Sequence, residues 1–331
     1  MVEREVREED VVWNVVWTGD VFDRLGYFVA SQIAQSRSRF RFVANGCPPV
    51  EVEKMEAFRA AHPDRVVEVL PVYDEMQAHG VALDAVRRLR DDGPWFAMID
   101  PDIKATAPFV DDLFARMPAV GAVTSGKEIW SRDSLLPENH PGLAGEFFFH
   151  SNGTVFGSPH LALYPRAVLE ETCERWGIGI GSGGPELRDD AKDRIAEMGW
   201  NFLVYDTGKI LNLLLQADGC ELVHHDLDQL VHIGGLSHYL FPSGYFTDED
   251  GTVEVDWARW GDIVAPRLEV ARFAGRLLSA LVDGAEPPPV PDVDDDHLQK
   301  VLPMVRDEIV DLVERYRPDM SRGVGAGGST P

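Results

Sequence analysis

The chain has 331 residues, 44% of them apolar, and a formal net charge of −25. It can bury the core of one large or two ordinary domains, and its acidity argues against nucleic-acid or anionic-membrane partners, which need a basic face. The three cysteines are far apart in the sequence, and the charged segment from Met1 to Asp10 does not resemble a secretory signal. No run reaches the ~20 apolar residues that span a bilayer, so we expect a cytoplasmic protein without a transmembrane segment.

Strands and helices alternate along the first 125 residues. Apolar, β-branched runs predict strands at 11–18, 41–44, 66–72, 95–99 and 120–125. Apolar residues at helical spacing predict helices at 22–36, 50–61, 81–89 and 108–117. This alternation is typical of a doubly wound α/β fold with a mostly parallel sheet.

The pattern is less regular from 126 to 245. A loop rich in Pro, Gly and Asn at 131–149 is expected to cover a ligand. Strands are predicted at 161–164 and 202–205, and helices at 166–176, 189–198 and 207–217. Gly179, Gly181 and Gly184 have the spacing of a dinucleotide fingerprint, but they follow a helix, which favours a mobile loop or turn over a cofactor cradle.

The last third is expected to be helical. A helical extension is predicted in 246–286, a Pro/Asp-rich linker in 287–296, an amphipathic helix in 297–318 and a disordered tail in 319–331. We expect the amphipathic helix to pack on the main domain or to form a homodimer, and the first 245 residues to form that domain.

Asp100-Pro101-Asp102 follows the apolar strand at 95–99. Ligands of open α/β sheets bind at the carboxyl ends of strands, and paired carboxylates there can hold Mg²⁺ or Mn²⁺ against a diphosphate. The alternative is a solvated turn, which is our interpretation of the second Asp-x-Asp copy, Asp292-Val293-Asp294, in the linker. The position of the first copy favours a metal site.

His232 and Asp206 are two further candidates. His232 precedes Ile233-Gly234-Gly235, where glycines allow close approach of the backbone, and it is either a third metal or phosphate ligand or a core histidine. Asp206 precedes a predicted helix, so its carboxylate either caps that helix or acts as a general base.

The order of these features resembles the GT-A-type glycosyltransferases that use nucleotide sugars. The resemblance spans Val11 to about His238 and rests on the strand ending in Asp100-x-Asp102, the Asp-headed segment at Asp206 and the late His232. It implies a GT-A-like Rossmann-type sandwich, with a nucleotide-sugar-binding half at 11–125 and an acceptor-binding half at 126–245.

The resemblance also implies roles for individual residues. Asp100, Asp102 and His232 would hold Mg²⁺ or Mn²⁺ on the donor diphosphate, and Asp206 would be the catalytic base of an inverting enzyme. Further donor contacts are expected from Thr18, Gly19, Asp20, Asn45 and Asp84, together with Asp100. Asn45 stands where the family commonly has Asp, and Tyr205-Asp206 stands where inverting members often have an acid pair.

We therefore expect a metal-dependent glycosyltransferase that moves a sugar from a nucleoside-diphosphate donor to an acceptor hydroxyl, with inversion. A retaining transferase on the same fold and a sugar nucleotidyltransferase are enzymatic alternatives, although Thr18-Gly19-Asp20 lacks the basic, glycine-rich loop of the latter. A non-enzymatic alternative is a scaffold that binds a partner through its C-terminal helix.

Overall fold

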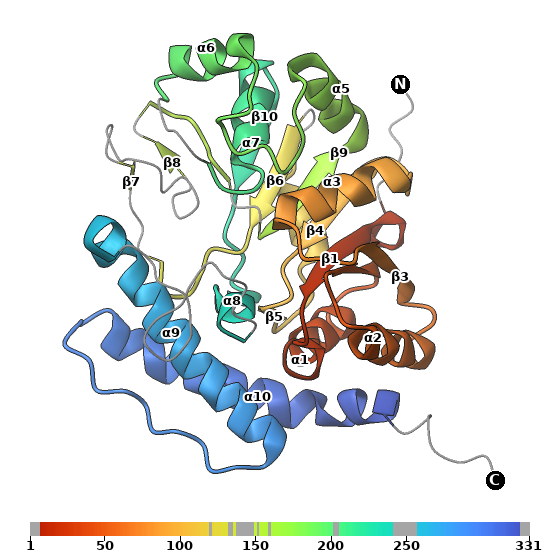
Figure 1. Cartoon of the computed structure of the whole chain (residues 1–331), viewed down its shortest axis with the longest axis vertical. Helices are drawn as coiled ribbons and strands as arrows, with labels where there is room; N and C mark the ends of the chain where they lie inside the picture. Colours follow the sequence, from red (N-terminus) through yellow and green to blue (C-terminus); the bar gives the residue numbers. More distant parts are fainter. Residues whose placement is uncertain are drawn as a thin grey trace.

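A central sheet with helices on both faces organises the chain (Figure 1). The computed structural model describes residues 7–118, 121–131, 135–136, 149–150, 152–157, 160–200, 205–240 and 257–324. Within this part, seven strands form the main sheet in the order β10-β6-β9-β4-β1-β2-β3. The strands are β1 (Val12–Thr18), β2 (Arg39–Asn45), β3 (Val66–Tyr73), β4 (Trp95–Ile99), β6 (Gly121–Ser125), β9 (Leu161–Pro165) and β10 (Glu221–His224).

The sheet is mostly parallel, as the sequence predicts. Strand β9 is the exception, since it pairs antiparallel with both β4 and β6, and the other described strands of this sheet run in one direction. Two small pairs lie outside it: β5 (Ile103–Ala105) with β11 (Leu230–His232), and β7 (Leu135–Leu136) with β8 (Phe149–His150).

Helices connect and cover the strands. After a 3₁₀ turn at Glu8–Asp10, the described helices are α1 (Phe22–Ala34), α2 (Pro49–Ala61), α3 (His79–Leu89), α4 (Val110–Arg116), α5 (Arg166–Trp176), α6 (Asp189–Glu197), α7 (Lys209–Ala217), α8 (Leu236–Leu240), α9 (Trp257–Asp283) and α10 (Leu298–Val324). None of the helices in this part of the chain has the length and apolarity needed to cross a bilayer.

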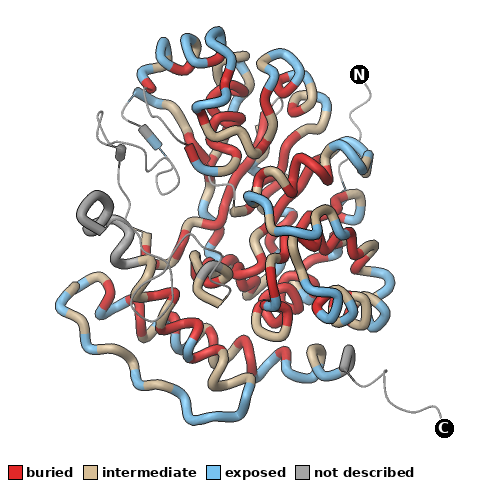
Figure 2. Tube along the Cα trace, in the orientation of Figure 1, coloured by how far each residue is buried: buried red, intermediate tan, exposed pale blue. Residues whose placement is uncertain are grey.

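The alternation of side chains along the strands produces two hydrophobic cores. Trp13, Val15 and Trp17 of β1 join the core under α1, α2, α9 and α10, whereas Val16 joins the core under α3, α5 and α7. The sheet is therefore buried on both faces, which Figure 2 shows as a continuous buried centre with exposed helical surfaces around it.

The C-terminal helices belong to the same unit as the sheet. Helices α9 and α10 pack on each other, and α10 packs against α1 and α2 (Figure 1). The apolar residues of the two helices, from Val270 to Leu278 and from Leu298 to Tyr316, join the first core. The exposed large apolar side chain on the described part of α10 is Met304, so the apolar face predicted as a homodimer surface is already covered. Helix α10 continues to Val324, six residues into the tail that we expected to be disordered.

Some predicted boundaries differ from the structure. Helix α7 begins at Lys209 with Gly208 at its N-cap, so Asp206 lies in the preceding turn instead of heading the helix. Residues 202–204 of the predicted strand at 202–205, most of the predicted loop at 131–149, and 325–331 lie outside the described residues. The prediction also lacked β5 and β11, because three-residue strands carry too little periodicity to be recognised.

A buried cation connects α10 to β5. The Lys104 side chain is 2% exposed, and its Nζ donates hydrogen bonds to Glu308 Oε2 and Asp311 Oδ2, both at 2.7 Å, and to the Glu308 carbonyl at 3.0 Å. This contact joins residues about two hundred positions apart in the sequence. It makes the position of β5 depend on the last helix of the chain.

We predict that Lys104→Met lowers the free energy of unfolding by about 1–3 kcal/mol, measured by urea denaturation. Three charge-assisted hydrogen bonds are lost, but the partly exposed carboxylates of Glu308 and Asp311 can be hydrated, which limits the cost. Lys300→Met, an exposed change on the same helix, is the control and should leave stability within about 0.5 kcal/mol. Equal stability of the two variants would contradict the prediction.

Candidate active site

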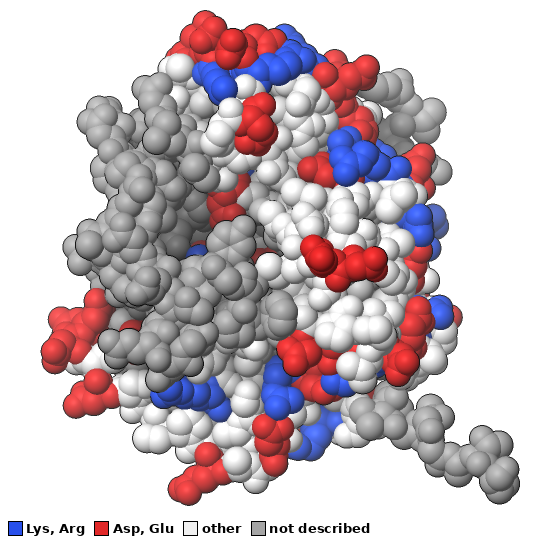
Figure 3. Space-filling view, in the orientation of Figure 1, with Lys and Arg blue, Asp and Glu red and all other residues white. Residues whose placement is uncertain are grey.

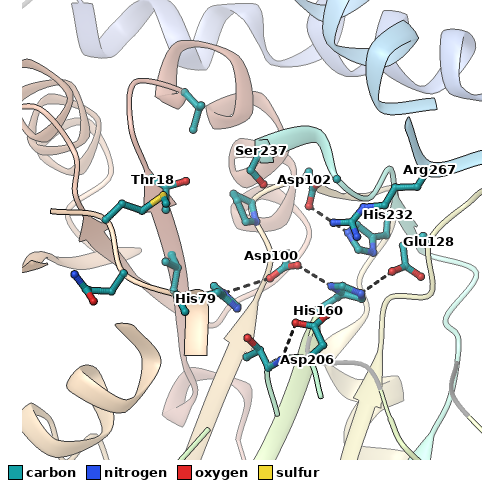
Figure 4. A pocket seen from close by; sticks show the side chains of 18 residues that line it. Thr18, His79, Asp100, Asp102, Glu128, His160, Asp206, His232, Ser237 and Arg267 are labelled. Carbon is teal, nitrogen blue, oxygen red and sulfur yellow. Dashed lines mark hydrogen bonds and ion pairs between the residues drawn. The ribbon is translucent and has the colours of Figure 1, made fainter. Parts of the chain in front are cut away.

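A cleft opens at the carboxyl ends of β1 and β4. The polar side chains that line it come from distant parts of the chain: Thr18 ends β1, Asp100 and Asp102 follow β4, His160 precedes β9, Asp206 precedes α7, and His232 ends β11. Figure 4 shows their side chains converging on one space. Four of the predicted metal and catalytic residues, Asp100, Asp102, Asp206 and His232, therefore lie in a single cleft.

His160 lies between two carboxylates at the centre of this cleft. Its Nδ1 is 2.9 Å from Asp100 Oδ2, and its Nε2 is 2.7 Å from Glu128 Oε1 (Figure 4). Antiparallel pairing of β9 with β4 brings His160 beside Asp100, whose backbone N–H donates to the His160 carbonyl at 2.7 Å. His79 Nε2 approaches the other Asp100 oxygen at 3.6 Å.

These contacts fix the charges of the buried pair. Burial by itself lowers the pKa of His160, but the charge of Glu128 and hydrogen bonds to Asp100 and Glu128 raise it to about 10. Burial likewise opposes ionisation of Glu128, but His160 and His232 lower the pKa of that carboxyl to about 2. His160 is consequently an imidazolium between two carboxylates at neutral pH.

Asp102 and His232 form a second buried pair. His232 Nε2 is 3.2 Å from Asp102 Oδ1, and both side chains are almost completely buried. The Gly126 carbonyl accepts a 2.6 Å hydrogen bond from His232 Nδ1, so Nε2 faces the cleft. Burial raises the pKa of Asp102, but His232 and the Leu236 N–H, which donates to Asp102 Oδ2 at 3.1 Å, keep it below its ordinary value.

Side chains that could ligate a metal meet in this cleft. One ligand atom from each of Asp100, His160 and His232 lies within 4.8 Å of the other two. Asp102 adjoins this group through His232. The predicted set of Asp100, Asp102 and His232 thus shares two members with this cluster, which contains His160 in place of Asp102.

Asp206 lies on a separate segment that also lines the cleft. Its side chain is exposed, and its Oδ1 accepts a hydrogen bond of 2.7 Å from the backbone N–H of Thr207. The carboxylate does not cap α7, which begins three residues later at Lys209. The predicted cap position of Asp206 is therefore wrong, although its carboxylate does accept a backbone N–H bond, as the structural alternative supposed.

Four residues predicted to contact the donor, Gly19, Asp20, Asn45 and Asp84, lie outside the cleft lining. Thr18 lines the cleft, whereas neighbouring Gly19 and Asp20 do not. Asn45 is fully buried, and its amide exchanges two hydrogen bonds with the backbone of Gln77, at 2.8 Å and 3.0 Å. Asn45 therefore holds the segment 76–79, which forms one wall of the cleft, without reaching the cleft itself.

Asp84 binds the protein's own glycine-rich loop. Its Oδ1 and Oδ2 accept hydrogen bonds of 3.0 Å from the N–H groups of Ile180 and Gly181. A Cβ atom on Gly179 would lie 2.2 Å from Asp84 Oδ2, which explains the glycine there. The structure does not show the predicted donor contact of Asp84, because this carboxylate lies outside the cleft. The N–H groups of the loop bind it in the way that such loops bind phosphate.

The sequence analysis missed His160, Glu128, His79 and Arg267. His160 comes directly before the apolar run of β9, and Asp100 comes directly after that of β4. These positions indicate a contact between the two residues only if the antiparallel pairing of β4 and β9 is already known. Among the described residues that line the cleft, Arg267 of α9 is the only Arg or Lys. Among the described residues on the face in Figure 3, acidic and basic side chains are interspersed and form no continuous basic surface.

Comparisons with known proteins give weak structural likenesses. No protein-family profile matches the chain, and no curated protein matches it by sequence. Among solved structures, the bifunctional glycosyltransferase WbbM matches with 16% identity over 49% of this chain and 33% of its own, so the chain spans about a third of WbbM, at a TM-score of 0.34.

Two other solved structures match over more of the chain. The glycosyltransferase GlyE of Streptococcus pneumoniae has 9% identity over 93% of this chain and 64% of its own, with a TM-score of 0.39. The galactosyltransferase LgtC, in complex with donor and acceptor sugar analogs, has 13% identity over 79% of this chain and 95% of its own, with a TM-score of 0.38. At these scores the matches do not assign an activity to the chain.

We predict that Asp84→Ala destabilises the fold by about 2–4 kcal/mol, because two N–H groups of the glycine-rich loop lose their acceptor. The free energy of unfolding in urea measures the effect. Asp193→Ala, an exposed change in the middle of α6, is the matched control. A change of less than about 0.5 kcal/mol for Asp84→Ala would show that the loop does not depend on this carboxylate.

Proposed function

We propose that the chain is a metal-dependent glycosyltransferase that moves a sugar from a nucleoside-diphosphate donor to a hydroxyl acceptor, with inversion. The observation that carries the proposal is the meeting of Asp100, Asp102, His232 and Asp206 in one cleft at the carboxyl end of a mostly parallel sheet. This is where open α/β sheets bind nucleotides. The resemblance of the motif order to GT-A-type enzymes supports the same assignment.

The buried acids fit a divalent cation. Asp102 Oδ1 and His232 Nε2 are 3.2 Å apart, close to the roughly 3 Å between neighbouring ligands of an octahedral Mg²⁺ or Mn²⁺ ion. Asp100, Asp102 and Glu128 together with one imidazolium leave an excess of negative charge that a single dication would neutralise. A cation bound at His232 Nε2 would take the place of the proton that faces Asp102, while the Nδ1–H bond to Gly126 would keep the ring oriented.

Asp100, Asp102 and His232 would hold this cation, while His160 fixes Asp100 as its hydrogen-bond partner. Both nitrogens of His160 already face carboxylates, so the imidazolium suits that positioning role better than ligation. When bound, Mg²⁺ or Mn²⁺ would offset the charge that develops on the diphosphate leaving group. A dianionic donor can then bind to a strongly acidic protein.

The chain's own residues place the two substrates. Thr18 and the segment 76–79 line the part of the cleft nearest β1 and suit the nucleoside, and Arg267 of α9 supplies a cation for the diphosphate. Asp206 removes the proton from the acceptor hydroxyl as its oxygen bonds to the anomeric carbon and the bond to the diphosphate breaks. The exposed Asp206 carboxylate can reach an acceptor that enters from solvent.

We predict that Asp102→Asn weakens Mn²⁺ binding at least about 100-fold, more than the loss of an outer-shell partner would cause, because a buried anionic ligand is removed. Isothermal titration calorimetry with MnCl₂ measures the affinity. Asp292→Asn, the same change in the exposed Asp-x-Asp copy of the linker, is the matched control and should bind like wild type. Equal Mn²⁺ affinity of the two variants would overturn the metal assignment.

We predict that Asp206→Asn lowers kcat by roughly 10²–10⁴-fold, the usual contribution of a general base, and leaves Mn²⁺ affinity unchanged. The donor is first identified by Mn²⁺-dependent thermal stabilisation with a panel of nucleotide sugars, and NMR then reads the anomeric configuration of the product. A retained configuration, or full activity of Asp206→Asn, would contradict an inverting mechanism with this base.

A further inference from the structure

A single buried side chain binds the backbone at both ends of the Asp100-Pro101-Asp102 turn. Gln32, in the last turn of α1, is fully buried, and its Nε2 donates hydrogen bonds to the carbonyl of Asp100 at 3.0 Å and of Ile103 at 2.8 Å. These two carbonyls lie on either side of Pro101 and Asp102. The amide therefore fixes both ends of the turn that carries the two carboxylates.

The residue before Gln32 holds the next part of the same segment. Ser31 Oγ accepts a 2.9 Å hydrogen bond from the backbone N–H of Ala105 and donates one of 2.6 Å to the Phe28 carbonyl. Two consecutive side chains of α1 thus bind three backbone groups between positions 100 and 105. Since both are completely buried, water does not compete for these bonds.

The backbone segment 100–105 also aligns His232, through strand pairing. Strand β5 pairs antiparallel with β11 so that Ile103 faces His232, and the Ile233 N–H donates to the Asp102 carbonyl at 3.2 Å. A shift of the backbone at 100–103 would therefore change the separation of Asp102 Oδ1 and His232 Nε2, now 3.2 Å. Gln32 itself does not line the cleft.

Packing alone does not account for a glutamine at this position. Its neighbours on α1, such as Phe28, Val29 and Ile33, belong to the hydrophobic core, and Gln32 Oε1 has no hydrogen-bond partner in the part of the chain that the structure describes. An apolar side chain of equal size would avoid the cost of that buried oxygen. The stabilising contribution of the side chain lies in the two bonds that Nε2 donates.

We propose that Gln32 is a positioning residue that sets the geometry of Asp100 and Asp102 toward His232, and through it the affinity of the cleft for a divalent cation. The inference rests on the proposed function, since it assumes that these side chains bind Mg²⁺ or Mn²⁺. Gln32 touches neither the cation nor a substrate. It acts through the backbone segment that carries Asp100 and Asp102, the proposed ligands of the cation.

Gln32→Met in the full-length chain tests this inference, because it keeps the volume and removes both donors. Mn²⁺ affinity is measured by calorimetry and, independently, by the EPR signal of free Mn²⁺. We expect binding weakened about 10-fold or more, as for other residues that orient metal ligands. Gln216→Met is the matched control: Gln216 Nε2 also bonds two backbone carbonyls, of Val155 and Asn212, but on α7 away from the cleft, and Mn²⁺ affinity should be unchanged.

Thermal unfolding without metal shows whether each variant is folded. If Gln32→Met does not fold, Gln32→Asn, which keeps an amide but shortens its reach, takes its place with the same expected direction. A folded Gln32 variant that binds Mn²⁺ as tightly as wild type would overturn this inference alone. Absence of Mn²⁺ binding by the wild-type chain would overturn the proposed function and this inference together.

Discussion

The site depends on how the protein compensates carboxylates that it removes from water. Asp102 and Glu128 are almost completely buried, and each faces an imidazole at 3.2 Å or less. An isolated buried carboxylate would be costly, so every element that brings a partner to it becomes necessary for the fold. Strand β9 brings His160 and strand β11 brings His232, and the geometry of the cleft follows from these two pairings.

Local signals allowed about half of this arrangement to be predicted. The alternating elements up to β6 and the position of Asp100 after β4 are encoded in short periodic stretches, and the structure confirms the mostly parallel sheet. His160 and Glu128 could not be predicted in the same way, because their proximity to Asp100 arises from tertiary contacts of β9 and of the segment after β6. Nothing within a few residues of either one encodes that contact.

Two predicted donor contacts are wrong because they rest on the type of a residue without its hydrogen-bond partner. Asp84 is predicted as a donor contact and the glycine-rich segment as a loop or cradle. In the structure, the Asp84 carboxylate accepts hydrogen bonds from the N–H groups of that loop. Asn45, at the end of β2, is a predicted donor contact, whereas its amide forms both hydrogen bonds with the backbone of Gln77. Buried polar groups are usually satisfied within the protein, so a polar residue type after a strand does not by itself indicate a ligand contact.

The bond between Lys104 and α10 has a consequence for biosynthesis. Helix α10 leaves the ribosome after every other described element, yet it supplies the carboxylates that receive the buried Lys104 and part of the core that covers α1 and α2. Strand β5, and with it the pairing that aligns Asp102 with His232, reaches its final environment only when that helix has docked. In a chain that ended before α10, Lys104 would lack these carboxylates and β5 would lack its final surroundings.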